Sequence, residues 1–141
     1  MFNNLMHTSC LHIISCVADH SMTTSKTGSL LTTHVLNTAD GVPGARMALS
    51  LHRLDPQMAL WNLVSKGTTD EDGQCSDLIS RDEFTAGMYK LRFETRQYWE
   101  SLCQSSFYPY IEIVFTITDL DQTFHLPLLL SRYSYSTYKG I

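Results

Sequence analysis

The chain has 141 residues, which is room for one domain, and its 43% hydrophobic and 11% aromatic residues are enough to form an ordinary core. Its formal net charge is −4, and its ten Lys and Arg residues form no run. Because phosphate binding needs clustered cations, this balance argues against a nucleic-acid-binding surface.

Residues 1–30 form a leader whose composition differs from the rest of the chain. It is rich in Ser, Thr and His, and its apolar patch, Cys10 to Ala18, is too short to span a bilayer. No basic residue precedes Lys26, so the leader lacks the charged start of a secretory signal. We expect a leader that is disordered or serves as a targeting segment, followed by one folded domain over residues 31–141.

The cysteine spacing indicates neither a zinc site nor a disulfide framework. The four cysteines are Cys10, Cys16, Cys75 and Cys103. Two lie in the leader, the other two are isolated, and none forms a C-x-x-C pair. They are therefore interpreted as reduced thiols.

The body alternates apolar and polar residues in short runs separated by turn signals, which is typical of a β-sandwich or barrel. Strands are expected at residues 31–38, 45–54, 60–66, 76–79, 87–94, 109–117, 124–131 and 133–141. In the second strand Met47, Leu49 and Leu51 are expected to face inward. The strand opened by Pro109 is expected to be the longest.

Two features indicate local helix. Ser80 to Glu83 has the S-x-x-E form of a capping box, which predicts one helical turn before Gly87 restarts the sheet. Thr95 is expected to cap a short helix that runs to Gln104. The pattern thus predicts an all-β fold with one short helix, compatible by itself with an immunoglobulin-like sandwich.

The strand from Phe124 to Ser131 places a single imidazole on an apolar surface. Its two-residue period puts Phe124, Leu126, Leu128 and Leu130 on one face and His125, Pro127 and Leu129 on the other. Because Pro127 cannot donate a ladder hydrogen bond, this strand is expected to be an edge strand or to be bulged. The segment that follows it is expected to dock against the fold.

Four motifs carry a resemblance to a known family. They are Thr33-His34-Val35-Leu36-Asn37, Phe107-Tyr108-Pro109-Tyr110, His125-Leu126-Pro127-Leu128-Leu129-Leu130-Ser131 and Tyr135-Ser136-Thr137-Tyr138. In this order the chain resembles the 5-hydroxyisourate hydrolases, the purine-catabolic relatives of transthyretin. The resemblance implies a transthyretin-like (prealbumin) two-sheet β-sandwich. It also implies a homotetramer, a dimer of dimers, with a central channel lined by the first strand, the His-Leu-Pro-Leu strand and the C-terminal strand.

The resemblance further implies that His34 and His125 are catalytic. An imidazole, with an unperturbed pKa of about 6.5, can take a proton from water and return one to a leaving nitrogen near neutral pH. The implied reaction opens the ring of the small molecule 5-hydroxyisourate in urate degradation and gives 2-oxo-4-hydroxy-4-carboxy-5-ureidoimidazoline. Without the family, His34 would more often be interpreted as a sheet-surface histidine bonded to a hydroxyl such as that of Thr32.

The chain departs from the family at positions that contact substrate. The implied substrate-binding residues are His34, Gln74, Tyr138, Lys139 and Ile141. The family has Arg where this chain has Gln74, and it ends Tyr-Arg-Gly-Ser. A neutral amide lacks the charge and the fork of donors of a guanidinium. We expect a hydrolase of reduced activity, with a catalytically impaired transthyretin-like small-molecule binding protein and an unrelated adhesion-type sandwich as alternatives.

No cofactor and no metal is expected. The histidines lack metalloenzyme spacing, and the acidic turn Asp70-Glu71-Asp72 is interpreted as a solvated hairpin rather than a cation site. Asn4-Leu5 and His12-Ile13 resemble a degenerate amino-terminal peroxisomal address. The expected compartment is the peroxisome or the cytoplasm, without secretion and without a membrane partner.

Overall fold

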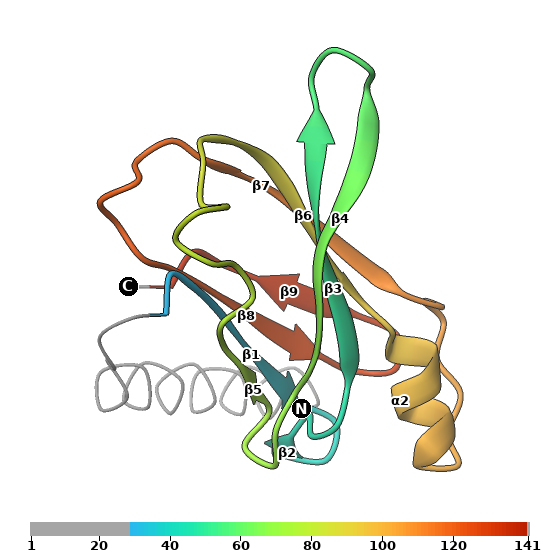
Figure 1. Ribbon diagram of the computed structural model, residues 1–141. Coiled ribbons are helices and arrows are strands. Elements are labelled where there is room, and N and C mark those ends of the chain that lie inside the picture. The colour runs from blue at the N-terminus through green and yellow to red at the C-terminus, as the bar shows by residue number, and fades with distance from the viewer. Residues whose placement is uncertain (1–28, 141) are drawn as a thin grey trace.

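The computed structural model describes residues 29–140, which form two β-sheets and one helix (Figure 1). The strands are β1 (Leu31–Asn37), β2 (Val42–Pro43), β3 (Ala48–Asp55), β4 (Leu60–Thr68), β5 (Gln74–Cys75), β6 (Gly87–Phe93), β7 (Ile111–Ile117), β8 (Phe124–Leu130) and β9 (Tyr135–Thr137), and the helix is α2 (Thr95–Ser101). Residues 1–28 of the leader, with Cys10, Cys16 and the peroxisome-like residues, and Ile141 lie outside the described residues, whereas Leu30 is buried in the core.

The strands pair into two sheets, as the family resemblance implied. The first sheet has the order β2-β1-β8-β9, with β5 also paired to β1, and the second has the order β4-β3-β6-β7. β1 and β8 run parallel. The three strands that the resemblance assigns to the channel wall, β1, β8 and β9, are therefore neighbours in one sheet.

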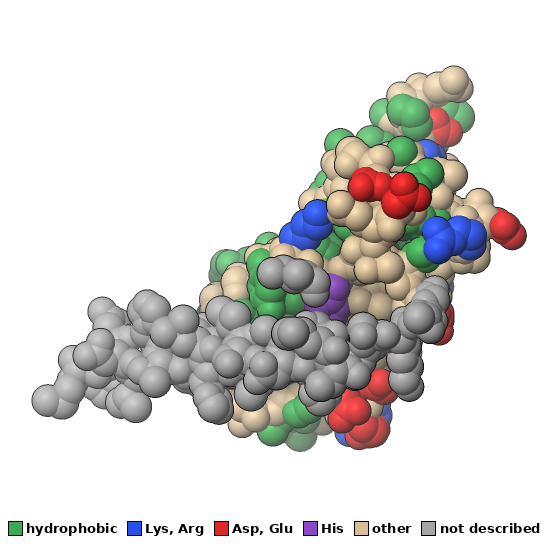
Figure 2. All heavy atoms as spheres, turned by 90° about the vertical axis from the view of Figure 1, so that its left-hand side faces the viewer, with side chains coloured by type: hydrophobic (Ala, Val, Ile, Leu, Met, Phe, Trp, Pro, Cys, Tyr) green, Lys and Arg blue, Asp and Glu red, His purple; other side chains and the backbone are tan. Residues whose placement is uncertain are grey.

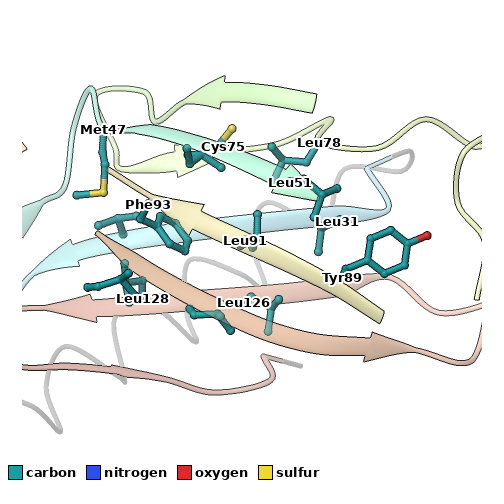
Figure 3. Close-up of a cluster of buried hydrophobic side chains, with 14 of the residues drawn as sticks. Leu31, Met47, Leu51, Cys75, Leu78, Tyr89, Leu91, Phe93, Leu126 and Leu128 are labelled. Atoms are coloured by element: carbon teal, nitrogen blue, oxygen red, sulfur yellow. The ribbon is translucent and has the colours of Figure 1, made fainter. Parts of the chain in front are cut away.

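The two sheets pack face to face around one apolar core (Figure 3). Leu31 and Leu128 of the first sheet point toward Leu91 and Phe93 of the second, and all four side chains are fully buried. Burying each such side chain stabilises the fold by roughly 1.5–3 kcal/mol. The predicted inward positions of β8 and of residues 47–51 are confirmed. Since successive strand residues alternate, this core also decides which residues lie outside the sandwich.

The strand predicted at residues 76–79 is wrong. Pairing with β1 is limited to Gln74 and Cys75, because Asp77 has a φ of 58°, which interrupts an extended chain. Leu78 and Ile79 are nevertheless buried in the core. Their apolar character reflects packing against the sheets rather than strand pairing.

The helix is shorter than predicted and is not capped by Thr95. Thr95 is the first helical residue, its predecessor Glu94 makes no side-chain capping bond, and the Thr95 hydroxyl donates to the Tyr108 carbonyl at 3.1 Å. Cys103, with a φ of 59°, lies where the helix was expected to continue. Among residues 29–140, no helix is long and apolar enough to cross a bilayer.

Only one of the two hydrogen bonds of the predicted capping box forms, and the predicted helical turn does not. The Ser80 hydroxyl donates to Oε1 of Glu83 at 3.1 Å, and the Glu83 amide donates to the Ser80 hydroxyl at 3.3 Å. The segment stays a turn, and β6 then begins at Gly87 as predicted. The longest strand is β4, with nine residues, whereas the strand after Pro109 has seven. β3 and β4 extend beyond the sandwich as a hairpin (Figure 1).

The prediction that Pro127 marks an edge strand is wrong, since β8 lies between β1 and β9. Its register with β9 ends at the pair Leu128 and Thr137, and the Pro127 carbonyl accepts a hydrogen bond from the Thr137 hydroxyl at 2.7 Å. The proline therefore lies where the ladder toward β9 stops. Its missing N–H is tolerated because no strand residue pairs with it on that side.

Candidate functional site

Both candidate catalytic histidines lie on the outer face of the first sheet. Leu31 and Val35 are buried in the core, so the alternate residues of β1 point outward. The parallel register pairs Thr32 with His125 and His34 with Pro127. The two histidines are thus on adjacent strands, offset by two residues, and strand geometry puts their Cα atoms roughly 8 Å apart. The term histidine face is used below for Thr32, His34, Gln74, His125, Pro127 and Leu129.

The sequence placed Leu129 outward, and the structure qualifies this placement. Leu129 alternates with the core residues of β8 and stays outside the core cluster, but its side chain is only 5% exposed. Tyr135 of β9 is 41% exposed. The exposed apolar surface of β8 and β9 is therefore smaller than the sequence predicted.

His34 is oriented by the acidic turn that follows β4. Its Nε2 lies 2.9 Å from the backbone carbonyl of Asp72, and the residue is 6% exposed. A carbonyl oxygen only accepts, so this hydrogen bond places a proton on Nε2 of His34. The Thr32 hydroxyl, the partner of His34 in the alternative interpretation as a sheet-surface histidine, bonds to His125.

His125 is oriented by two segments that are distant in sequence. Its Nδ1 lies 2.6 Å from the Thr32 hydroxyl, and its backbone carbonyl accepts the Gly140 N–H at 2.7 Å. Gly140 is close enough that an added Cβ would lie 2.8 Å from the His125 Cδ2 atom. The Nε2 atom of His125 is buried and finds no hydrogen-bond partner among residues 29–140.

The environment keeps His125 neutral. Burial lowers the pKa of His125 below its usual 6.5, and the nearby imidazole of His34 lowers the pKa further. A neutral ring near pH 7 has a nitrogen lone pair ready to accept a proton. A buried nitrogen without a partner in the described chain is the pattern expected of a group that meets a substrate or water.

Gln74 joins the histidines from the opposite edge of β1. Its Cα is the register partner of His34 across the antiparallel β1 and β5 pair, so the two side chains leave the same face of the sheet. Its backbone N–H donates to Oδ1 of Asp70 at 2.9 Å, which ties the strand to the acidic turn. The first sheet thus brings His34, His125 and Gln74 to one face from three different strands.

The C-terminal candidates are placed differently from one another. Tyr138 follows β9, and partial burial raises the pKa of its hydroxyl. The Lys139 ammonium lies 5.4 Å from the centre of the Phe124 ring, whose side chain belongs to the core side of β8. The structure therefore does not bring the Lys139 amine together with the imidazoles, and Ile141 lies outside the described residues.

Sequence reasoning did not find the contact between Thr32 and His125. The two residues are separated by 93 positions, and only the parallel register of β1 and β8 places them opposite each other. The sequence shows that the Thr32 hydroxyl lies two residues before His34. It does not show that this hydroxyl bonds to His125. The Asp72 carbonyl was also missed, because a backbone acceptor leaves no signal in side-chain identity.

Figure 2 shows the molecule from the left-hand side of Figure 1. Cationic and anionic side chains are interspersed over this face, and a histidine side chain reaches the surface. No field of one sign is evident in this view. Within residues 29–140, no three His, Cys, Asp or Glu side chains form a group that could hold a metal ion.

Comparisons with known proteins agree on one family. A model of the HIUase/Transthyretin family matches residues 31–140. A 5-hydroxyisourate hydrolase of Mus musculus is 48% identical over 112 residues, which cover 79% of this chain and 95% of the mouse protein. A 5-hydroxyisourate hydrolase of Salmonella dublin is 34% identical over 128 residues, 91% of this chain and 93% of that protein. The structure of sea bream transthyretin in complex with thyroxine matches with a TM-score of 0.75 at 29% identity, covering 79% of this chain and 95% of that one.

Proposed function

Because the chain belongs to the HIUase/Transthyretin family, we propose that it hydrolyses 5-hydroxyisourate and that His34 and His125 perform the proton transfers. The observation that carries the residue assignment is their position on one face of adjacent strands. One has its tautomer set by a carbonyl, and the other is neutral with a buried nitrogen that lacks a described partner. This pairing supplies the acid and the base that ring opening needs.

The reaction adds water across a ring C–N bond. An imidazole nitrogen takes a proton from water as the water oxygen bonds to the ring carbonyl carbon. The C–N bond then breaks, and the proton is delivered to the leaving nitrogen, so the enzyme is unchanged at the end. Positioned acid–base groups of this kind contribute roughly 10²–10⁴ in rate.

Gln74 and Tyr138 are proposed to contact the substrate beside the imidazoles. The register of Gln74 with His34 supports this role, because it places both side chains on one face. The side-chain amide of Gln74 can donate hydrogen bonds to a polar heterocycle and accept them from it. The proposal that Lys139 and Ile141 also bind substrate rests on the family resemblance alone. The neutral amide at residue 74 supplies no charge to a developing oxyanion, so the hydrolase is proposed to be slow.

The alternative of an impaired transthyretin-like binding protein is less well supported. The mouse relative that is 48% identical is named a hydrolase, and both imidazoles are in place on the histidine face. A binding protein would not need a neutral, buried imidazole with an unpartnered nitrogen among the described residues.

The test measures the decay of 5-hydroxyisourate generated by urate oxidase in a spectrophotometer. The wild type is expected to accelerate the decay, and His34→Ala and His125→Ala are each expected to abolish the acceleration while remaining folded. His52→Ala is the matched control, because His52 lies on β3 of the other sheet. A folded His34 or His125 variant that hydrolyses at the wild-type rate removes that residue from the mechanism.

We further propose that the protein is a homotetramer whose first sheets line a substrate channel. The edge strands β7 and β9 each pair on one side only within the described chain, and they carry exposed Val114 and Tyr135. Free edges and exposed apolar side chains favour pairing with another copy.

The peroxisome or the cytoplasm is the proposed compartment. Imaging of the tagged full-length chain tests this proposal.

A further inference from the structure

We propose that Thr32 is a positioning residue that holds the proton of neutral His125 on Nδ1, so that Nε2 presents its lone pair to water. This inference rests on the proposed function, and it assigns to His125 the removal of the proton from water. Thr32 does not touch the substrate in this scheme. It acts through the hydrogen bond between its hydroxyl and the His125 Nδ1 atom, which is 2.6 Å long.

The register of the sheet makes this contact rigid. Thr32 and His125 are direct partners in the parallel ladder of β1 and β8, and seven consecutive pairs fix that ladder. On the core side of the same strand, the Thr33 hydroxyl donates to the carbonyl of Leu126 at 2.5 Å. Gly140 closes against the other edge of the His125 ring. The ring is thus held between a hydroxyl and a backbone segment.

The choice between the two neutral tautomers follows from the partners that each nitrogen has. A hydroxyl can donate to Nδ1 or accept from it, so the contact alone permits either tautomer. With the proton on Nε2, the ring would bury an N–H without an acceptor among residues 29–140. Orphaned buried N–H groups are rarer than under-satisfied acceptors. The proton therefore belongs on Nδ1, where it is donated to Thr32.

The two histidines then hold a proton on opposite ring nitrogens. The Asp72 carbonyl holds the proton of His34 on Nε2, whereas the Thr32 hydroxyl holds the proton of His125 on Nδ1. When His125 takes a proton from water at Nε2, its Nδ1–H continues to donate to Thr32. His125 can later give up the Nε2 proton from the same nitrogen, which returns the ring to its starting tautomer without any rotation.

The test compares Thr32→Val with the wild type by long-range ¹H–¹⁵N correlation spectra of the histidine rings and by steady-state kinetics. The wild type is expected to show His125 as the Nδ1–H tautomer, and Thr32→Val is expected to shift it toward a mixture with Nε2–H. The kcat should fall about tenfold to a hundredfold, less than removal of an acid–base group itself, with KM changed less than about twofold. Thr32→Ser retains the hydroxyl and should restore both the tautomer and most of the rate.

Thr68→Val is the matched control, because Thr68 is an exposed strand residue of the other sheet. An Nε2–H tautomer in the wild type, or an unchanged tautomer in folded Thr32→Val, overturns the inference. If Thr32→Val does not fold, the wild-type spectrum decides alone. If the wild type does not accelerate hydroxyisourate decay, the proposed function fails, while the spectra still decide whether Thr32 sets the tautomer.

Discussion

At the scale of single residues, the site is defined by how each polar group on the histidine face is held. His34 is bonded to a carbonyl, His125 to a hydroxyl, and Gln74 is tied through its backbone to Asp70. The family resemblance implies an arginine at position 74. Gln74 is therefore the residue at which the chemistry of this chain is expected to be weakest.

The first prediction is that Gln74→Arg raises kcat/KM for hydroxyisourate by about tenfold to a thousandfold. Gln74 leaves the same face as His34, so a guanidinium placed there could donate two hydrogen bonds to substrate oxygens. A charge aimed at a developing oxyanion in a water-poor site stabilises it by a few kcal/mol. Steady-state kinetics with enzymatically generated substrate measure the change.

Gln97→Arg is the control for this prediction, because it adds the same charge at an exposed position of α2. Ile141→Ser, which introduces the hydroxyl of the family's ending, should add less, since a hydroxyl carries no charge. If Gln74→Arg and the double variant both leave the rate unchanged in a folded protein, the face is organised for a different ligand. The binding-protein alternative would then replace the hydrolase.

The second prediction concerns stability below neutral pH. Burial lowers the pKa of both His125 and His52 below 6.5. The imidazole of His34 lowers the pKa of His125 further. At His52, the charges of Lys90 and Arg92 also lower the pKa, whereas the charge of Glu112 raises it. As pH falls through about 6.5, the unfolded chain binds protons at both histidines and the folded chain does not. The unfolded state then holds more protons, so the free energy of unfolding decreases until the lower folded pKa values are reached.

Urea unfolding between about pH 7.5 and pH 5 measures this dependence. The contribution of these histidines becomes constant about one pH unit above 6.5, where both states are neutral. His52→Asn and His125→Asn should each flatten the slope below that pH. A slope that is the same in the double variant as in the wild type would show that other groups dominate the acid response.

At the scale of elements, the acidic turn between β4 and β5 is what places His34. Gly73 adopts a φ of +78°, and its carbonyl accepts the Val35 N–H at 2.8 Å. A Cβ at Gly73 would lie 2.3 Å from the Val35 carbonyl oxygen, so no other residue fits without movement. The turn therefore packs directly against β1, and the Asp72 carbonyl lies within hydrogen-bond distance of His34 Nε2.

The third prediction is that Gly73→Ala lowers both stability and kcat. The left-handed conformation costs an alanine about 1–2 kcal/mol, and the overlap with Val35 should bring the total to about 3 kcal/mol or more. Gly41→Ala is the matched control: it has a φ of +69° but no atom within 4 Å of the added Cβ, so only the backbone cost applies. Chemical denaturation measures both variants. Equal losses for the two would mean that the turn can move away from β1 at little cost.

At the scale of the whole molecule, the sandwich presents four sheet edges, and their side chains differ. β7 carries Val114, which is 54% exposed, and β4 carries Leu63, which is 53% exposed. Both are apolar residues on outer strands of the second sheet. The family resemblance implies a tetramer, and the two edges formed by β7 and by β9 are the ones proposed to pair between copies.

The fourth prediction is that light scattering at micromolar concentration gives about four times the chain mass of 16.0 kDa. Val114→Lys should shift the distribution toward smaller species, because an edge lysine opposes strand pairing between copies. Leu63→Lys makes the same change on β4 and should leave the mass unaltered. A monomer mass for the wild type would refute the tetramer, and equal effects of the two lysines would refute the β7 edge as the interface.

The sequence by itself determined the fold class, the inward face of most strands and the residues of the two histidine motifs. Alternation along β8 depends only on neighbours in the chain, which is why Leu126 and Leu128 were predicted to be buried and His125 to be outward. The same local rules failed at residues 76–79 and at Thr95. There a left-handed residue, Asp77, and a contact with the Tyr108 carbonyl overrode the local preference.

Only the tertiary structure decided which distant groups meet. Hydrogen-bond partners across a sheet depend on the register of strands that are far apart in sequence, and no local pattern encodes that register. Thr32 was therefore seen as a neighbour of His34, whereas the parallel pairing of β1 with β8 places it on His125. The same pairing puts Pro127 in a central strand. Its missing N–H is tolerated there because β9 stops pairing with β8 before Pro127, and not because β8 is an edge strand.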